Sequence, residues 1–257
     1  MGKGIWLVFG LLAMMVSVPQ HVHALDVGAP MYQKDVKGDL GLELIVERFD
    51  RDVETELEFD DDASLLDEKD TDGIDQTAVM ARLHLPLSSQ ASLFVDVGVI
   101  DDDDADDTPF AVGAGTQFKV YDERDLRVNF VAEGHWVPSY DFSEHRTSPR
   151  NISYTLKGDK DYYELGAGLL VSGNARIDRQ ARLIPYGGIM VSMLRGSGDI
   201  EAHDLGYVFD GSLDIKEDQP VVAVAGLAFV LQKNITLRLE GRFIGDSSIS
   251  AGMGVAF

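Results

Sequence analysis

The chain ends with the stretch ISAGMGVAF, residues 249–257, and this stretch decides the fold class. Every second residue in it is apolar: Ile249, Ala251, Met253, Val255 and Phe257. The residues between them are serine, glycine or alanine. Successive side chains of a β-strand point to opposite faces, so this period of two predicts a strand with one apolar face and one small or polar face.

The segment just before it repeats the pattern with charges on the second face. Ile235, Leu237 and Leu239 alternate with residues that include Arg238 and Glu240. Charged side chains on a strand need water or each other. The interior of a membrane-spanning barrel offers both, whereas lipid offers neither.

The same alternation recurs toward the N-terminus and gives ten candidate strands. Six more alternating segments lie near 40–46, 79–87, 93–99, 110–118, 126–136 and 163–171, and two segments near 181–193 and 220–231 are apolar on both faces. Their lengths are close to the roughly 9–11 residues that a tilted strand needs to cross the hydrocarbon. We predict an all-β fold: one antiparallel up-and-down transmembrane β-barrel over residues 39–257, with eight strands as the alternative.

The period alone does not say which face is inside. A soluble periplasmic sandwich or lipocalin-like barrel would bury the apolar rows instead of exposing them to lipid. The placement of aromatic residues favours the membrane. We expect two levels at the membrane interfaces: Phe110, Trp136, Tyr163 and Phe243 at the external level, and Phe118 and Phe257 at the periplasmic level.

The connections alternate in length. We expect long ones near 51–76, 101–109, 138–158 and 194–219, and short ones at 88–90, 122–125, 172–180 and 232–234. Long external loops and short periplasmic turns are typical of outer-membrane barrels. The connection around 245–247 is the exception, because it is short although it should be external.

The N-terminus reads as a cleaved signal peptide, residues 1–24. Lys3 precedes an apolar run over 5–16, and Val22-His23-Ala24 supplies a cleavage site. The run is too short for a transmembrane helix, which needs about 20 residues. Residues 25–38 then form a short periplasmic segment. The chain has no cysteine, which excludes disulfides and a lipoprotein anchor at the cleavage site.

Acidic residues dominate the charge, with 44 Asp and Glu against 22 Lys and Arg and a formal net charge of -22. Such a charge argues against nucleic acid as a partner, because phosphates would be repelled. Two acidic segments hold most of the excess and contain candidate ligands for loosely bound Ca²⁺ or Mg²⁺: Asp60, Asp61, Asp62, Asp101, Asp102, Asp103 and Asp104. Neither segment has EF-hand spacing, and no resident cofactor is expected.

Charged residues on the non-lipid face form the expected lumen set: Glu43, Glu47, Arg82, Asp96, Lys119, Arg127, Glu133, Glu164, Arg238, Glu240 and Arg242. Mixed signs at this density predict either an ion-pair network that fills the interior or the lining of a narrow wet pore. In the second case, the acidic loops would raise the local cation concentration at the mouth.

The C-terminal stretch resembles the sorting signal of bacterial outer-membrane proteins. The final Phe257 and the apolar residues two and four positions before it, Val255 and Met253, match that signal. As a pattern, residues 38–257 resemble the superfamily of small outer-membrane β-barrels, among them OmpA-like transmembrane domains and OmpW-like proteins. The resemblance implies an outer-membrane location, assembly by the barrel-assembly machinery, and contact with outer-membrane lipid and lipopolysaccharide.

The expected function is an envelope-structural or surface-interaction role, with a narrow, cation-preferring channel as the alternative. A hydrolase of omptin or lipid A deacylase type is a minor alternative. It would need an acid–base pair at the external rim, for which His145 and His203 are the candidates. No family motif surrounds either histidine, so an enzyme is not expected.

Cleavage after Ala24 is directly testable. The intact mass of the protein extracted from an outer-membrane fraction should correspond to a chain that begins at Leu25. A mass that retains residues 1–24 would contradict the signal-peptide interpretation.

Overall fold

The computed structural model describes residues 40–59, 66, 68–123, 125–147, 153–178, 180–204, 207–231, 234–244 and 246–257. The predicted signal peptide and the segment 25–38 lie outside the described residues. Every regular element among the described residues is a β-strand. Within the same residues, no helix is long and apolar enough to cross a membrane.

Twelve strands make up one sheet. They are β1 (Gly41–Phe59), β2 (Glu68–Pro86), β3 (Ala91–Asp102), β4 (Phe110–Glu123), β5 (Leu126–Thr147), β6 (Ser153–Gly173), β7 (Ala175–Arg176), β8 (Ala181–Asp204), β9 (Tyr207–Glu217), β10 (Val221–Leu231), β11 (Ile235–Phe243) and β12 (Asp246–Ala256).

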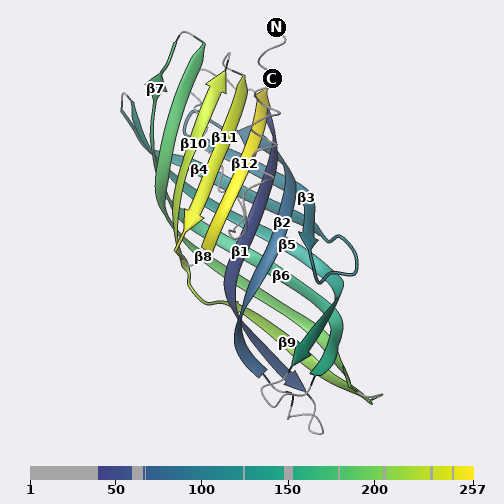
Figure 1. The fold of residues 1–257 in the computed structure, drawn as a ribbon. Helices are drawn as coiled ribbons and strands as arrows, with labels where there is room; N and C mark the ends of the chain where they lie inside the picture. Colours follow the sequence, from purple (N-terminus) through teal and green to yellow (C-terminus); the bar gives the residue numbers. More distant parts are fainter. Residues whose placement is uncertain are drawn as a thin grey trace.

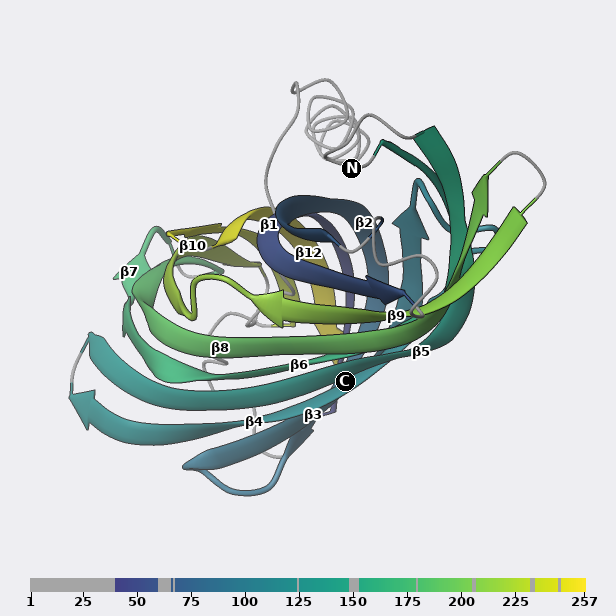
Figure 2. The same ribbon diagram turned by 90° about the horizontal axis from the view of Figure 1, so that it is seen from below.

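Ten of these strands close a ring in the order β1-β2-β3-β4-β5-β6-β8-β10-β11-β12, and β12 pairs back with β1 (Figure 1). All pairings are antiparallel. The two remaining strands are additions: β7 pairs with the start of β8, and β9 pairs with β8 and β1. The view from below in Figure 2 shows β8, β6, β5 and β4 curving around one side of this ring. The predicted ten-stranded up-and-down barrel is confirmed.

The outer face of the ring carries a continuous belt of exposed apolar side chains. Its members come from every ring strand and include Leu42, Leu44, Val97, Leu169, Ile189, Leu227, Leu239 and Met253. The predicted aromatic residues Trp136, Tyr163 and Phe257 are exposed on it as well. A soluble barrel would bury these rows, so the fold matches a barrel that is surrounded by lipid.

Three of the predicted long loops are wrong, because the strands continue through them. The pairing of β1 with β2 extends from Gly41↔His84 to Leu57↔Glu68, across most of 51–76. The same holds for 138–158, where β5 pairs with β6, and for 194–219, where β8 pairs with β9. Only the connection after β3 keeps the loop character predicted for 101–109.

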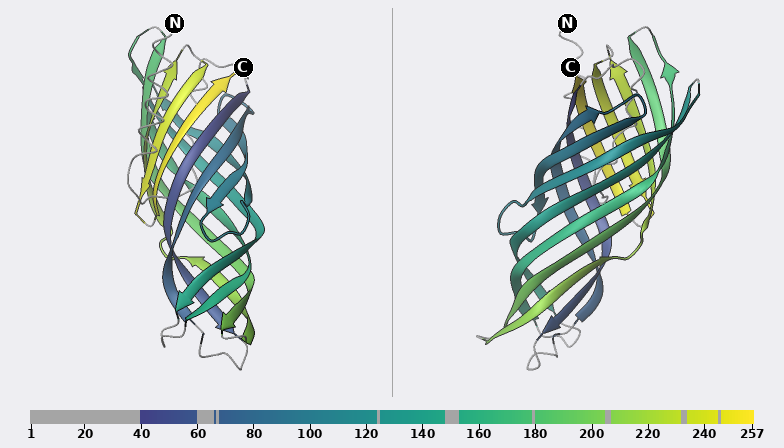
Figure 3. Two further views of the ribbon diagram at one scale, coloured as in Figure 1. Left: turned by 45° about the vertical axis from the view of Figure 1, so that its right-hand side comes forward. Right: turned by 180° about the vertical axis from the view of Figure 1, so that it is seen from behind.

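These extensions form what we call the head. It consists of residues 49–59 of β1, 68–76 of β2, 138–147 of β5, 153–162 of β6, 194–204 of β8, and β9. Both views in Figure 3 show these strands continuing well past the ends of β10, β11 and β12, away from the end where the chain terminates.

The polarity of the two faces reverses where β1 enters the head. In the belt, Leu42 and Leu44 point outward and are half exposed. In the head, Val53 and Leu57 point inward and are 1% exposed, while the outward positions are acidic, as at Glu56. Apolar side chains therefore face lipid at one level and the barrel interior at the next, which is the arrangement expected where the surroundings change from lipid to water.

Two valines on the outer face test this boundary. Val97 lies in the belt and Val208 in the head, and both are about half exposed. Val97→Arg should lower the free energy of unfolding by about 2–4 kcal/mol, because it places a charge in lipid. Val208→Arg should change it by less than about 0.5 kcal/mol, as at a wet surface. Equal effects in urea unfolding from lipid bilayers would contradict the assignment of the two levels.

Candidate functional site

The barrel interior has two layers. At the level of the apolar belt it holds most of the buried charged side chains together with a small apolar cluster that includes Leu170 and Met190, and in the head it is filled mainly with apolar side chains. An ion or solute that passed through the lumen would have to cross both layers.

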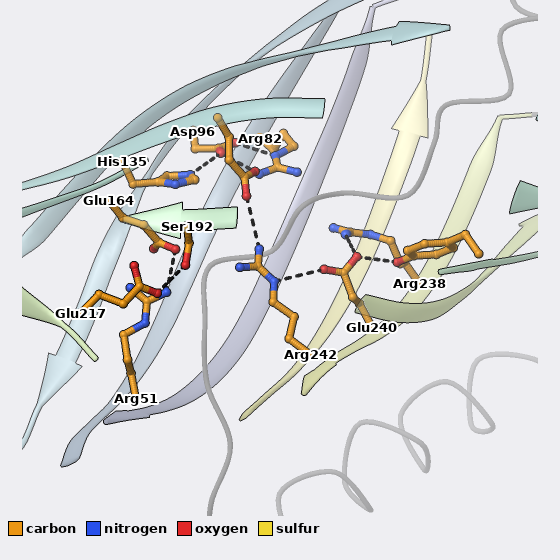
Figure 4. Close-up of polar contacts among 12 residues, drawn as sticks. Arg51, Arg82, Asp96, His135, Glu164, Ser192, Glu217, Arg238, Glu240 and Arg242 are labelled. Atoms are coloured by element: carbon orange, nitrogen blue, oxygen red, sulfur yellow. Dashed lines mark hydrogen bonds and ion pairs between the residues drawn. The ribbon is translucent and has the colours of Figure 1, made fainter. Parts of the chain in front are cut away.

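A two-hydrogen-bond ion pair in the charged layer joins β2 to β3. The Arg82 guanidinium donates two hydrogen bonds to the Asp96 carboxylate, with Nε–Oδ1 at 2.7 Å and Nη2–Oδ2 at 2.8 Å (Figure 4). His135 Nε2 lies 3.0 Å from the second of these oxygens. The guanidinium carbon also sits 4.1 Å from the centre of the Phe94 ring, a cation–π contact. Arg82 and Asp96 are both 1% exposed, so this pair is fully sealed from water.

A second group joins the closing strands β11 and β1. Arg238 Nε donates to Glu43 Oε1 at 2.9 Å, and Arg238 Nη1 lies 3.5 Å from Glu240. The other oxygen of Glu43 lies 3.1 Å from His84 Nε2. Tyr186 of β8 donates its hydroxyl to Glu240 at 2.6 Å, so four strands meet in this group.

Two more arginines reach across the lumen. Arg242 of β11 contacts Glu133 of β5 at 3.3 Å, and Arg51 of β1 donates to Glu164 of β6 at 2.7 Å. Glu47 is buried in the same layer and interacts electrostatically with Arg242. These contacts tie opposite walls of the barrel together, which is how charges in a low-dielectric interior avoid being stranded.

The structure thus brings most of the predicted lumen set into one network, but it separates two members. Lys119 and Arg127 lie near the β4–β5 turn and contact Asp122, at 3.0 and 3.2 Å. The network also contains Arg51. The sequence analysis did not predict this residue, because it expected residues 51–76 to form a loop. Its position continues the spacing of Glu43 and Glu47, and that spacing is the signal that could have found it.

An apolar core fills the head above this network. It draws side chains from β1, β5, β6, β8 and β9, among them Val53, Leu57, Val137, Phe142, Leu156, Leu194, Ile200, Leu213 and Ile215. Tyr154 of β6 packs edge-on against Phe59 of β1, with ring centres 6.4 Å apart. Interiors of this kind pack to the density of organic crystals, so the core occupies the lumen at the level of the head.

A polar seam lies between the two layers and uses one of the predicted metal ligands. Asp102 accepts hydrogen bonds from Gln76 at 2.7 Å and from Tyr140 at 2.6 Å, and its carboxylate lies 3.2 Å from Lys160 Nζ. Burial raises the pKa of Asp102, but the Lys160 ammonium and the hydrogen bonds outweigh it and hold the pKa below its ordinary value. Asp102 is therefore a structural anion.

The structure does not bring the predicted Ca²⁺ or Mg²⁺ ligands Asp101 to Asp104 together in one group. The carboxylate of Asp102 is committed to the seam, whereas Asp101, Asp103 and Asp104 are exposed. Over the whole described part of the chain, no group of three or more His, Cys, Asp or Glu side chains could hold a metal ion. Asp60, Asp61 and Asp62 lie outside the described residues.

The outer face of the head carries an acidic groove of about 550 Å³ across β5, β6, β8 and β9. Its charged lining consists of one lysine, Lys157, and six carboxylates: Asp106, Asp141, Asp159, Asp199, Glu201 and Asp210.

Several of these acids are direct cross-strand neighbours. Asp141 pairs with Asp159, and Glu201 pairs with Asp210. Like charges placed directly opposite each other destabilise a sheet. In the adjoining loop, burial and the nearby Glu144 and Asp102 raise the pKa of Asp104, a further sign of crowded negative charge.

The two histidines considered for acid–base chemistry lie at the rim of this groove. His145 Nδ1 is hydrogen-bonded to Thr155 Oγ1 at 2.9 Å, and Thr155 is also the register partner of His203. His203 Nε2 lies 3.1 Å from Glu201. Neither histidine belongs to the buried network.

Solved structures of two bacterial proteins resemble this chain. The outer-membrane protease OmpT of Escherichia coli matches with a TM-score of 0.51 and 10% identity, over 90% of this chain and 100% of that one. The translocator domain of the autotransporter NalP from Neisseria meningitidis has a TM-score of 0.45 and 12% identity, over 85% and 88% of the two chains. No family model matches the sequence, and no curated protein does either. At these identities the likeness concerns the fold alone.

The network can be tested through the Arg82–Asp96 pair, which makes two hydrogen bonds. Asp96→Ala should destabilise the barrel by about 3–5 kcal/mol, because it leaves Arg82 buried without this partner. The double variant Arg82→Met/Asp96→Leu should recover most of that loss, because it removes both charges. Urea unfolding of the three proteins in detergent measures the difference. A double variant as unstable as Asp96→Ala would contradict this prediction. It would mean that the ion pair itself adds stability and does not only neutralise two buried charges.

Proposed function

Because the chain has the fold of a bacterial outer-membrane β-barrel, we propose that it lies in that membrane as a closed barrel and acts through its external head. The head would serve a surface-interaction role, in which its acidic groove binds a cationic segment of a partner. The observation that carries this proposal is the apolar core of the head, which fills the place where a channel would need water.

The core supports a binding role over transport. A solute on its way through the lumen would have to displace buried side chains such as Leu57, Leu156 and Ile200, and then break ion pairs such as Arg51–Glu164. Both layers are held by many contacts at once, so opening them costs far more than moving a loop. The cation-preferring channel is therefore the weaker candidate.

The outer surface supports the choice of partner. Six carboxylates and one lysine line the groove, and two carboxylate pairs face each other across strands. A cationic side chain placed between such neighbours relieves their repulsion and gains charge-assisted hydrogen bonds. We propose no catalytic role for His145 and His203, since their described contacts are with Thr155 and Glu201.

The binding role is tested with poly-L-lysine and the mature protein in zwitterionic detergent. The triple variant Asp199→Asn/Glu201→Gln/Asp210→Asn should bind at least about tenfold more weakly than the wild type, because each lost charge pair contributes roughly 0.5 kcal/mol or more. Fluorescence anisotropy at two salt concentrations gives the dissociation constants.

A second triple variant is the matched control. Asp52→Asn/Glu58→Gln/Asp101→Asn removes the same charge from exposed positions outside the groove and should bind nearly as tightly as the wild type. Equal weakening by both triples would mean that net charge, not the groove, attracts the polycation. In planar bilayers the wild-type protein should stay silent, and stable cation-selective steps would instead support the channel.

A further inference from the structure

Positive charge gathers at the end of the barrel opposite the head. Three short stretches, 118–127, 173–183 and 231–235, hold seven of the 22 Lys and Arg residues of the chain but only four acids. The bases are Lys119, Arg124, Arg127, Arg176, Arg179, Arg182 and Lys233, and the acids are Asp122, Glu123, Asp125 and Asp178. The strand ends in these stretches all lie where the chain terminates (Figure 1). This end therefore carries more bases than acids, in a chain whose net charge is -22.

The hairpin that leads into β8 places two of these bases directly opposite each other. Arg176 of β7 and Arg182 of β8 are register partners, and like charges in that position disfavour sheet pairing. The acid between them in sequence, Asp178, uses Oδ1 to accept the backbone N–H groups of Gln180 and Ala181, at 2.6 and 2.7 Å. None of the carboxylates that the structure describes forms an ion pair with Arg176.

Both arginines lie on the lumen side of the wall. On β8, Arg182 precedes the buried Ile184 on the same face. Arg176 continues the face of the buried Ser172, because β6 and β7 pair with β8 in one unbroken register. The outer face of the hairpin ends on Ile177, which is 59% exposed. Surrounding lipid would meet this apolar outer face, so the two cations are directed toward the opening of the lumen.

Two neighbouring strands add cations to the same opening. Lys119 of β4 and Arg127 of β5 both contact Asp122, at 3.0 and 3.2 Å, so one carboxylate serves two bases. Arg127 is also the register partner of Ser172, which places it on the lumen side. The terminal carboxylate of Phe257 follows β12, and β10 and β11 separate that strand from β8. The positive charge is thus concentrated on one arc of the opening, from β4 to β8.

We propose that this arc, the basic rim formed by Lys119, Arg127, Arg176 and Arg182, binds an acidic segment of a protein partner in the periplasm. The inference rests on the membrane orientation proposed above, in which the head faces outward. Guanidinium groups pair with carboxylates through two parallel hydrogen bonds, so an acidic side chain between Arg176 and Arg182 would relieve their repulsion.

The acidic head does not oppose this binding. Arg182 and Asp199 lie on the same strand, β8, roughly 55 Å apart along it at about 3.3 Å per residue. That separation is several times the Debye length of about 8 Å at physiological salt. The basic rim therefore presents its own local charge to a ligand, although the whole chain is strongly acidic.

Arg195 and Lys216 provide a matched control at the other end of β8. They too are register partners on adjacent strands. Acids surround Lys216, however: Glu54 is its register partner on β1, Asp214 lies 3.4 Å away and Glu56 3.7 Å away. Removing this pair takes the same charge from the protein without touching the basic rim.

The test is fluorescence anisotropy of labelled poly-L-glutamate with the mature protein in zwitterionic detergent, at two salt concentrations. The wild type should bind, and more tightly at the lower salt concentration. Arg176→Gln/Arg182→Gln should bind at least about fivefold more weakly, because two charge pairs with the ligand are lost. Arg195→Gln/Lys216→Gln should bind as the wild type does. Both variants should keep the wild-type midpoint of urea unfolding, since neither pair belongs to the buried network.

Three results would overturn the proposal. The first is a wild-type protein that does not bind poly-L-glutamate, and the second is equal binding by the two double variants. The third is a wild-type protein that ignores poly-L-glutamate but binds purified peptidoglycan through Arg176 and Arg182, which would assign the rim to the cell wall. Poly-L-lysine binding tests the groove separately, so a protein that binds only poly-L-glutamate would support the rim and contradict the proposed function.

Discussion

The structure depends on one constraint: each level of a strand must match what lies outside the wall and, at the same time, fill what lies inside. In the belt the outside is apolar, and the small and charged residues take most of the inner face. In the head the outside is polar, and the apolar residues move inward, as at Val53 and Leu57. One strand such as β1 therefore carries two opposite polarity patterns in a single run of 19 residues.

The charged interior follows from the same constraint. A ten-stranded ring encloses more space than short side chains can fill. If its inner positions were also apolar throughout, the two faces of each strand would be alike and the strand register would be poorly specified. Long arginine side chains fill that space, and each is balanced by carboxylates, on a neighbouring strand as in Arg82–Asp96 or across the lumen. The result is a set of cross-lumen ties such as Arg51–Glu164 and Arg242–Glu133, which hold the barrel closed beneath the apolar core of the head.

Much of the fold could be predicted from the sequence, because period-two alternation and aromatic placement are local signals. The strand number, the outward apolar rows and the inward position of Arg82 or Glu240 all follow from them. The head could not be predicted in this way. Between Asp52 and Asp75 acidic residues dominate the composition and suggest a loop, although Val53 and Leu57 keep the alternation of a strand. The ion pairs were equally out of reach, because partners such as Arg51 and Glu164 are 113 positions apart and meet only through the register and tilt of the closed ring.

The most direct measurement is cysteine labelling on intact cells, which is clean because the chain has no cysteine of its own. Three variants of β1 sample the three environments: Leu44→Cys in the belt, Glu56→Cys on the outer face of the head, and Leu57→Cys in its core. A water-soluble maleimide should label only Glu56→Cys, whereas a lipid-soluble maleimide should also reach Leu44→Cys. Rapid labelling of Leu57→Cys by the water-soluble reagent in a well-folded barrel would contradict the reversal of faces on which this account rests.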